Sequence, residues 1–368
     1  MHGFEYRFPA VRGIQAGREF YVAMCPMGLV PRLFVPDESV AQPVDRSQRV
    51  LNPARVPRLA QFLAANSGDY SFGAIVGCID GPVSFDSVGV DTDWDLGRLV
   101  FSMSTHLYLT DGQHRWRAIA EAVQLEPGLE TEAVPVVLYV DEGVERRQQM
   151  FADLNMHAIR PTRSLGILYD HRDPLADLSR ALAEAVPLFA GRTEFEKTTI
   201  SNRSGKVFTL SAIYAATGAL LNNSGGEPIA TPERDTAQRF WSTLTEVLPG
   251  WTDVVEGSLK PAELRAGYVH GHGVVLQALG SAGRALLAQE QDWEARLREG
   301  ALASINWARS NADLWEGRAL SDGRVSKASR HVALTAALIK TQLGLSLSAR
   351  EVELEAEARA VQDEGEAA

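Results

Sequence analysis

The residue types best suited to chemistry lie together in one short segment between a strand pattern and a helix pattern. The segment reads Asp111-Gly112-Gln113-His114-Arg115. Apolar residues recur at helical spacing from Trp116 to Val123, which predicts a helix that begins within this segment. The glycine lets a phosphate or another backbone approach closely. Backbone N–H groups, the positive end of the helix dipole and the Arg115 guanidinium would therefore converge and form an anion site.

Asp111 and His114 have several chemical options in such a site. A carboxylate repels a phosphate, so Asp111 would hold a divalent cation or a water molecule, or it would orient Arg115. His114 could donate to a phosphate oxygen or exchange a proton near neutral pH. Thr110 or Asp111 could cap the first turn of the helix. The alternative is a capped helix start with a solvated histidine and an Asp–Arg pair, because Asp-Gly turns before helices are common.

The elements that must position this segment change character along the chain. Residues 7–35 alternate between short apolar stretches and Gly or Pro, the pattern of strands and turns. The rest of the first half predicts a helix over 56–65 and strands over 71–79, 99–109 and 134–140, the last apolar enough to be buried on both faces. In the second half, helical spacing predicts helices over 209–221, 231–248, 260–293 (with glycine breaks) and 325–343.

These patterns predict an α+β fold class, in which a mixed α/β domain precedes a mostly helical part. We expect the first domain at residues 1–175 and the helical part, a candidate DNA-binding or oligomerisation region, at residues 176–350. Residues 351–368 hold seven acidic side chains and one basic side chain. This composition predicts a disordered acidic tail.

The overall charge does not decide whether the protein binds nucleic acid. The net charge is −11, of which the acidic tail contributes −6, whereas residues 318–340 carry five bases and one acid. Local patches therefore decide the question. The two cysteines, Cys25 and Cys78, form no CxxC pair, which excludes a zinc ribbon or a disulfide framework. We expect both to be buried thiols.

The sequence shows no pattern typical of a membrane span or a signal peptide. The longest nearly apolar run, residues 133–140, is far shorter than the roughly 18 residues that cross a bilayer. The first five residues lack the basic and apolar regions of a signal peptide, so we expect a cytoplasmic protein with no membrane partner.

A second wall of the anion or DNA site could follow the helix expected over residues 145–155. That helix would bury Val144, Phe151 and Leu154. The candidates beyond its apolar face are Asn155, Arg160 and Arg163. The alternative is a helix end at which cations compensate the helix dipole.

Another basic cluster lies at the start of the last predicted helix. Arg324, Lys327 and Arg330 are spaced three residues apart and would suit phosphate contacts on a DNA face. A solvated basic helix start fits the pattern equally well. His270 and His272 stand at i and i+2, which would point them apart on a helix, so no metal site is predicted.

The Asp111–Arg115 segment also matches the DGQHR signature of a bacterial group with a ParB/sulfiredoxin-like fold. The chain resembles one branch of that group, the DndB family of DNA phosphorothioation (DNA sulfur modification) proteins. The matching segments, in order, are Phe8–Glu19, Gln149–Asn155, Arg160–Leu165, Leu168–Asp173 and Phe208–Tyr214. The pentapeptide alone is moderately specific, whereas the ordered set is strongly specific.

The resemblance implies a ParB/sulfiredoxin-like domain followed by helices, and a DNA-binding repressor of the operon that encodes the sulfur-modification machinery. It also implies a nucleotide site, for ATP with Mg²⁺, that modulates DNA binding. We expect the nucleotide phosphates to contact Gly112, Gln113, Arg115 and Asn155, and Asp111 and His114 to be catalytic in any ATPase activity. The expected DNA-binding residues are Arg160, Arg163, Arg324, Lys327 and Arg330.

Two other functions stay open at this point. One is a nucleotide hydrolase or DNA-processing enzyme of the modification and restriction system, and the other is a scaffold that bridges other components. A repressor is normally a symmetric oligomer on palindromic DNA, so we expect a homodimer or larger homo-oligomer on the double-stranded promoter of its own operon. Neither cysteine lies in a basic sequence environment, which favours a regulatory and not a catalytic link to sulfur.

Overall fold

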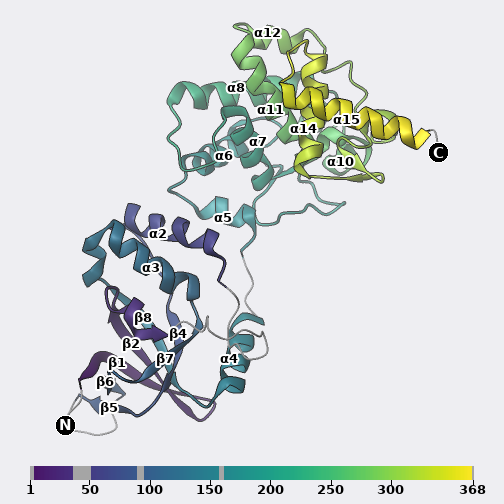
Figure 1. The fold of residues 1–368 in the computed structure, drawn as a ribbon. Coiled ribbons are helices and arrows are strands. Elements are labelled where there is room, and N and C mark those ends of the chain that lie inside the picture. The colour runs from purple at the N-terminus through teal and green to yellow at the C-terminus, as the bar shows by residue number, and fades with distance from the viewer. Residues whose placement is uncertain (1–3, 36–50, 89–94, 157–160, 367–368) are drawn as a thin grey trace. The chain divides into compact units, whose positions relative to one another are not determined.

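Two compact units, Met1–Ile159 and Arg160–Ala368, make up the chain in the computed structural model. The structure describes residues 4–35, 51–88, 95–156 and 161–366. The expected class is confirmed, because a mixed sheet with helices precedes a mostly helical region (Figure 1). The units divide earlier than the expected boundary at residue 175, since α5 (Arg163–Tyr169) packs against helices of the second unit.

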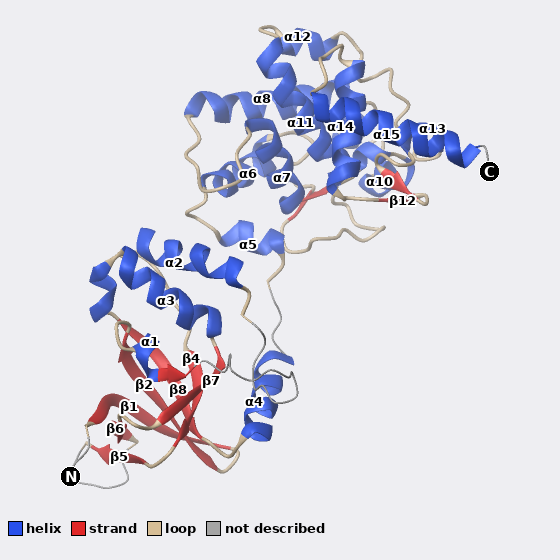
Figure 2. Ribbon diagram, viewed as in Figure 1, coloured by secondary structure: helices blue, strands red, loops and turns tan. Residues whose placement is uncertain are grey.

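Eight strands form one mixed sheet in the described part of the first unit (Figure 2). They are β1 (Glu5–Gln15), β2 (Arg18–Pro26), β3 (Phe34–Val35), β4 (Ile75–Asp80), β5 (Val83–Ser87), β6 (Leu96–Ser102), β7 (His106–Asp111) and β8 (Ala133–Val140). Their spatial order is β3-β7-β4-β8-β2-β1-β6-β5. The pairs β3–β7 and β4–β8 are parallel, and the other neighbours are antiparallel.

The single strand expected over residues 99–109 is wrong. A turn separates β6 from β7, closed by a hydrogen bond of 3.0 Å from the Thr105 N–H to the Ser102 carbonyl. Because of this turn, β7 does not pair with β6. It pairs instead with β4, near the opposite edge of the sheet. As a result, the strand that leads into the Asp111–Arg115 segment lies between β3 and β4.

Two helices lie side by side on one face of this sheet (Figure 1). These are α2 (Val56–Ala65), which has the expected bounds, and α3 (Gln113–Leu125). Their apolar stripes, including Leu63 and Ile119, pack with the buried residues of the strands. Shorter elements of this unit are α1 (Val30–Leu33), η3 (Pro53–Arg55) and η4 (Pro127–Thr131). The burial of one α3 face fixes where its first turn lies.

The remaining described helix of this unit, α4 (Val144–Met156), packs against the opposite face of β4 and β7. Side chains alternate between the two faces of a strand. Ile79 belongs to the core under α2 and α3, whereas its neighbour Cys78 contacts Met150 of α4, with 3.9 Å between the two sulfur atoms. Thus α4 approaches the start of α3 from the other side of the sheet.

The second unit is built around α11 (Gly273–Gln289), which packs against α7 and α14. Its helices are α5, α6 (Pro174–Ala185), α7 (Leu210–Leu221), α8 (Thr231–Val247), α9 (Trp251–Glu256), α10 (Pro261–Gly267), η5 (Val269–Gly271), α11, α12 (Trp293–Arg298), α13 (Ala312–Trp315), α14 (Ser329–Gln342) and α15 (Ala349–Glu366). Short strand pairs are β9 (Thr193–Glu194) with β10 (Phe208–Thr209), and β11 (Leu320–Ser321) with β12 (Arg324–Val325).

Glycine allows α11 to contact its neighbours closely. A Cβ atom built on Gly280 would lie 2.1 Å from the carbonyl oxygen of Ala216 in α7, a distance that no real side chain tolerates. The expected helix over residues 260–293 is broken as predicted, because α10 and η5 precede α11. The break places the start of α11 at Gly273, beside the start of α7.

The disordered tail expected over residues 351–368 is wrong, because α15 extends to Glu366. Three of its acidic side chains, Glu351, Glu355 and Glu357, have basic partners elsewhere in the unit. The Arg318 guanidinium donates to both carboxylate oxygens of Glu355, at 2.7 Å for the Nη2–Oε2 contact, and Lys340 Nζ lies 2.6 Å from Glu351 Oε1. Composition alone indicated a solvated chain, but these ion pairs hold the helix against α14.

Replacing Glu355 by alanine should destabilise the second unit by about 3 kcal/mol, because it leaves a mostly buried arginine without its partner. The Arg318 and Glu355 side chains are only 16% and 12% exposed. Glu353→Ala is the matched control, since Glu353 is 61% exposed and pairs with Arg350 within the same helix. Urea unfolding of the two variants measures the difference. Equal midpoints would show that the Arg318–Glu355 pair does not hold α15.

Candidate functional site

The connection from β7 to α3 turns at a glycine with left-handed backbone. Asp111 ends β7, Gly112 has φ of +96°, and α3 begins at Gln113. Side chains are disfavoured at such φ values. A Cβ on Gly112 would also lie 3.2 Å from Arg115 Nε and 3.4 Å from the Ile75 Cα. Backbone conformation and close packing therefore both require glycine here.

The first turn of α3 has no side-chain cap in the described part of the chain. Gly112 is the N-cap residue, and the first backbone bond of the helix, 2.8 Å long, is from the Trp116 N–H to the Gly112 carbonyl. The expected cap from Thr110 or Asp111 is wrong, because Thr110 is fully buried beside Cys78 and Asp111 contacts Arg115. No described side chain therefore occupies the N–H groups of Gln113 and Arg115 in the first turn, where the helix dipole favours an anion.

The Arg115 guanidinium is confined at this helix start. Its Nη2 lies 2.8 Å from Asp111 Oδ2. Gly73, in the loop before β4, lies directly beside the guanidinium: a Cβ at this position would be 2.7 Å from Arg115 Nη1. Only glycine therefore leaves room for the guanidinium here. Its Nε is buried and finds no hydrogen-bond partner among the described residues. Of the options for Asp111, the orientation of Arg115 is the one that the structure shows.

His114 is held by a backbone group that lies far away in the sequence. The Asn52 N–H donates to His114 Nε2 over 3.2 Å. Nε2 therefore carries a lone pair, and the proton of the neutral ring lies on Nδ1. The Asn52 side chain accepts from the Ala54 N–H and so begins η3, ahead of α2. This contact fixes the imidazole beside the first turn of α3.

These residues line a small cavity. It has a volume of about 260 Å³, and its walls are Asp111, Gly112, Gln113, His114, Arg115 and Phe151. Pockets that enclose a whole small ligand are typically about 300–1,000 Å³. The size therefore suits one or two phosphate groups better than a complete nucleotide. We call this cavity the α3 site.

Asn155, expected at the same site, has another role. Its amide Nδ2 donates to the Phe151 carbonyl, 2.9 Å away in the same helix, and Asn155 does not line the α3 site. The expected buried set of this helix is also wrong. Val144 and Leu154 are exposed and Met150 is buried, because α4 contacts the sheet through Met150 and through Arg147, whose guanidinium lies 4.2 Å from the centre of the Tyr108 ring.

The two cysteines are buried, as expected. Burial raises the pKa of Cys25 to about 12, and burial also raises the pKa of Cys78. Both groups are therefore protonated at neutral pH, and a thiol is a weaker nucleophile than a thiolate. Neither environment favours sulfur transfer by these residues.

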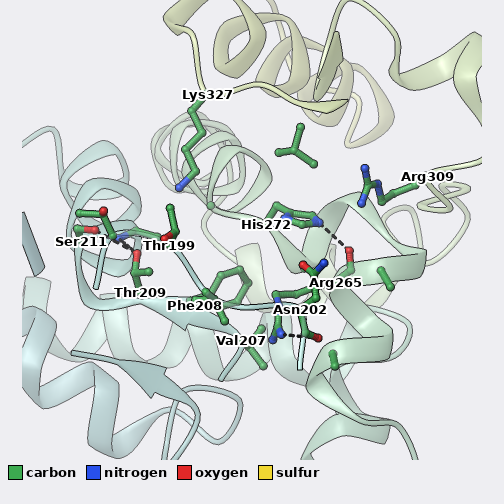
Figure 3. Close-up of a pocket in the computed structure, with 18 of the residues that line it drawn as sticks. Thr199, Asn202, Val207, Phe208, Thr209, Ser211, Arg265, His272, Arg309 and Lys327 are labelled. Carbon is green, nitrogen blue, oxygen red and sulfur yellow. Dashed lines mark hydrogen bonds between the residues drawn. The ribbon is translucent and has the colours of Figure 1, made fainter. Parts of the chain in front are cut away.

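The expected DNA-binding residues fall into different environments. Arg163 and Lys327 line one open cavity of about 820 Å³ in the second unit, which we call the helical-unit cavity (Figure 3). Arg324 is exposed in β12 and has no ion pair in the described part of the chain. Arg330 Nη2 lies 3.8 Å from Glu357 Oε2 of α15. Arg160 lies outside the described residues.

His270 and His272 are parts of the packing of the second unit. The His270 Nε2 donates to the Pro249 carbonyl over 2.7 Å, and the His272 Nε2 donates to the Arg265 carbonyl over 2.8 Å. Burial lowers the pKa of each imidazole to about 4, so both rings are neutral at pH 7. The described residues include no group of three or more His, Cys, Asp or Glu that could hold a metal ion.

Comparison with protein families gives the site its context. The model of a family described as DndB, DNA-sulfur modification-associated, matches residues 8–346. The chain belongs to the DndB family. A search of curated proteins and a search of solved structures each found no match. The DndB match includes both the α3 site and the helical-unit cavity, whereas the ParB/sulfiredoxin-like identity of the first unit stays a prediction.

In the described ranges of this DndB-family chain, no helix combines the length and the apolar character that a membrane span requires.

Sequence reasoning found the core of the α3 site but missed two of its supports. Asn52 and Gly73 act through a backbone N–H and through the absence of a side chain, so neither residue has a chemical signature in the sequence. The one available signal was Asn52-Pro53, which marks a helix start and brings the Asn52 backbone to this region.

Gly112→Ala should destabilise the first unit by about 1–2 kcal/mol, the cost of a left-handed backbone for a residue with a Cβ. Gly68→Ala is the control, because a Cβ on Gly68 would meet no described atom within 4 Å and its φ is not left-handed. Urea unfolding followed by circular dichroism compares them. A Gly112→Ala variant as stable as Gly68→Ala would contradict the strained turn.

Proposed function

We propose that this DndB-family chain is a DNA-binding transcriptional repressor of the DNA phosphorothioation operon, and that nucleotide phosphates at the α3 site modulate its DNA binding. Family membership links the chain to DNA sulfur modification. The role as a repressor and the binding of a nucleotide go beyond family membership and are our proposal. The protein acts in the cytoplasm, where its own promoter DNA lies.

The observation that supports the nucleotide most strongly is the uncapped start of α3 beside a confined arginine. The N–H groups of Gln113 and Arg115 lie before the first backbone hydrogen bond of the helix, and no described side chain caps them. Arg115 adds a fixed positive charge, and its buried Nε has no partner within the described chain. A phosphate oxygen would satisfy these donors, since a buried unsatisfied group costs about 1–3 kcal/mol.

The residues present fit the phosphates of ATP. Gln113, His114 and Arg115 would hold phosphate oxygens through backbone N–H groups and the guanidinium. Asp111 is the one carboxylate among the described residues that line the α3 site, so it would face the Mg²⁺ that accompanies the phosphates. Bound ATP would supply a negative charge that offsets Arg115. The small cavity leaves the nucleoside outside the α3 site, where further parts of the chain could contact it.

The alternative function, a nucleotide hydrolase or DNA-processing enzyme, receives less support from the geometry. A general base needs a lone pair directed at the nucleophile. The His114 Nε2 lone pair accepts from the Asn52 N–H, and the Asp111 carboxylate pairs with Arg115. Both candidate catalytic groups are thus occupied in positioning. We therefore assign Asp111 to the orientation of Arg115 and His114 to the positioning of the start of α3.

DNA binding is assigned to the basic residues of the second unit. Arg324 presents an exposed guanidinium, whereas Arg330 is partly neutralised by Glu357.

A repressor that reads palindromic DNA acts as a symmetric oligomer. The outer surface of β1 and β2 supports a homo-oligomer, because Val11 and Met24 are 49% and 43% exposed there.

Arg115→Ala should weaken ATP binding by at least about tenfold, because a charge-assisted hydrogen bond contributes about 1.5–3 kcal/mol. Arg117→Ala, an exposed arginine on the same helix, should bind ATP like the wild-type chain. Gly73→Ala should have an intermediate effect, since its methyl group displaces the Arg115 guanidinium. Isothermal titration calorimetry measures all three, and equal affinities of Arg115→Ala and Arg117→Ala would exclude the α3 site as the ATP site.

Arg324→Ala should reduce the affinity for promoter and random DNA alike and lower the salt slope by about one unit, as expected for one lost phosphate contact. Arg330→Ala should lower the slope by less, because Glu357 already offsets its charge. Gel shifts at several salt concentrations give both slopes. If Arg324→Ala keeps the wild-type slope, the β11–β12 turn is not part of the DNA interface.

A further inference from the structure

The helical-unit cavity is formed where three segments of the second unit meet. These are the β10–α7 connection around Thr209 and Ser211, the start of α11 at Gly273, and the segment that precedes α14 at Lys327 (Figure 3). Its volume is about 820 Å³, well within the range of about 300–1,000 Å³ for small-molecule sites. The cavity belongs entirely to one unit and shares no described residue with the α3 site.

The charge of this cavity has one sign. Its described lining includes Arg163, Arg265, Arg309 and Lys327 and no acidic residue. In the described part of the chain, none of these four cations has a carboxylate within ion-pair distance. This contrasts with Arg318 and Lys340 of the same unit, which pair with α15. Unpaired cations in a concave surface raise the local concentration of anions.

One of the four cations is used to build the cavity wall. The Arg265 guanidinium donates to the carbonyls of Ser201, Ser204 and Lys206, and so it holds the loop that closes one side. Arg309 donates to the Gly323 carbonyl over 3.2 Å and keeps its other donors for a ligand. The Arg163 guanidinium lies 5.8 Å from the centre of the Tyr214 ring.

Lys327 lies beside the start of α11. A Cβ on Gly273 would lie 3.3 Å from Lys327 Nζ, so a glycine makes room for the ammonium group at the first residue of α11. No described side chain caps this 17-residue helix. Figure 3 shows Lys327 extending into the cavity toward the side where Thr199 and Ser211 lie. Lys327 is exposed as a whole residue, and the partial burial of its side chain lowers its pKa.

The other polar groups complete a lining that can bind an oxyanion. Thr199 and Ser211 supply hydroxyl donors. His272 is neutral at pH 7, because burial, Arg309, Arg265 and Lys327 together lower its pKa to about 4. Ile200 and Val325 add apolar surface to the same cavity. The lining therefore combines cationic and hydroxyl groups with apolar surface.

We propose that the helical-unit cavity is a second phosphate site, and that it takes a small phosphate-bearing molecule with Lys327 on the phosphate and the apolar surface against the remainder. A phosphate oxygen would accept from Lys327 and from the first N–H of α11. Arg309 lines the cavity away from Lys327 and adds positive charge there (Figure 3). The concave shape favours a small ligand over the convex backbone of duplex DNA. This site is independent of the α3 site.

The test uses the full-length Arg115→Ala chain, in which the α3 site lacks its guanidinium. Isothermal titration calorimetry with inorganic pyrophosphate and with adenosine monophosphate should detect binding. Adding Lys327→Met should weaken binding by at least about tenfold, through loss of a charge-assisted contact. Arg163→Ala is a second variant at the cavity. Lys260→Met is the matched control, because Lys260 belongs to the same unit and does not line the cavity.

The outcomes separate the two sites and the two sources of phosphate. Binding that falls with Lys327→Met and Arg163→Ala, but not with Lys260→Met, supports the proposal. It is overturned if neither probe binds, or if both cavity variants bind as well as the control. A short DNA duplex that binds through Lys327 while pyrophosphate and adenosine monophosphate do not would overturn the small-molecule assignment. A failure here leaves the Arg115-dependent binding of ATP to the α3 site unaffected.

Discussion

The left-handed backbone of Gly112 is the constraint on which the α3 site depends. It lets β7 turn directly into α3, with Gly112 as the only residue between the strand and the helix. Gly112 has no side chain that could cap the helix. The N–H groups of Gln113 and Arg115, in the first turn of the helix, then have no capping side chain among the described residues. The same short turn brings Asp111 and Arg115 within 2.8 Å of each other, and Gly73 closes the other side of the guanidinium. Strand, turn and helix thus position the polar groups of the site.

The second unit depends on a different balance, between acidic and basic groups. The sequence concentrates bases at residues 318–340 and acids after residue 350. In the structure α15 brings three of those acids onto Arg318, Arg330 and Lys340, so much of the positive charge is neutralised within the unit. The cations of the helical-unit cavity escape this neutralisation. They, and the exposed Arg324, are the charges that stay available to anionic partners.

The sequence predicted those structural features that depend only on residues close together in the chain. The strand–turn–helix pattern at residues 107–120, the bounds of α2 and the glycine break before α11 all follow from residue spacing and turn chemistry. The family could also be inferred from ordered motifs, and the match over residues 8–346 confirms it. Contacts between residues far apart in the sequence could not be predicted from residue spacing or motifs. Asn52 with His114, and Gly73 with Arg115, act through the backbone.

The tail and the second cavity illustrate the same limit. Seven acidic side chains within residues 351–368 predict disorder when their basic partners are unknown. The partner of Glu355, Arg318, lies 37 positions earlier. Likewise, Arg163 and Lys327 were separate candidates in the sequence, and only the packing of α7 against α11 brings them to one cavity. Charge and composition identified the residues, whereas tertiary packing determined which of them act together.

The central claim is that phosphate at the α3 site and DNA at the second unit are energetically coupled. The most direct measurement is the affinity of the full-length protein for its own promoter, by fluorescence anisotropy, with and without ATP and Mg²⁺. Coupled sites typically change each other's affinity by about 5–150-fold. We expect a change in that range for the wild-type chain and none for Arg115→Ala. A promoter affinity that ATP leaves unchanged in the wild-type chain would contradict the account.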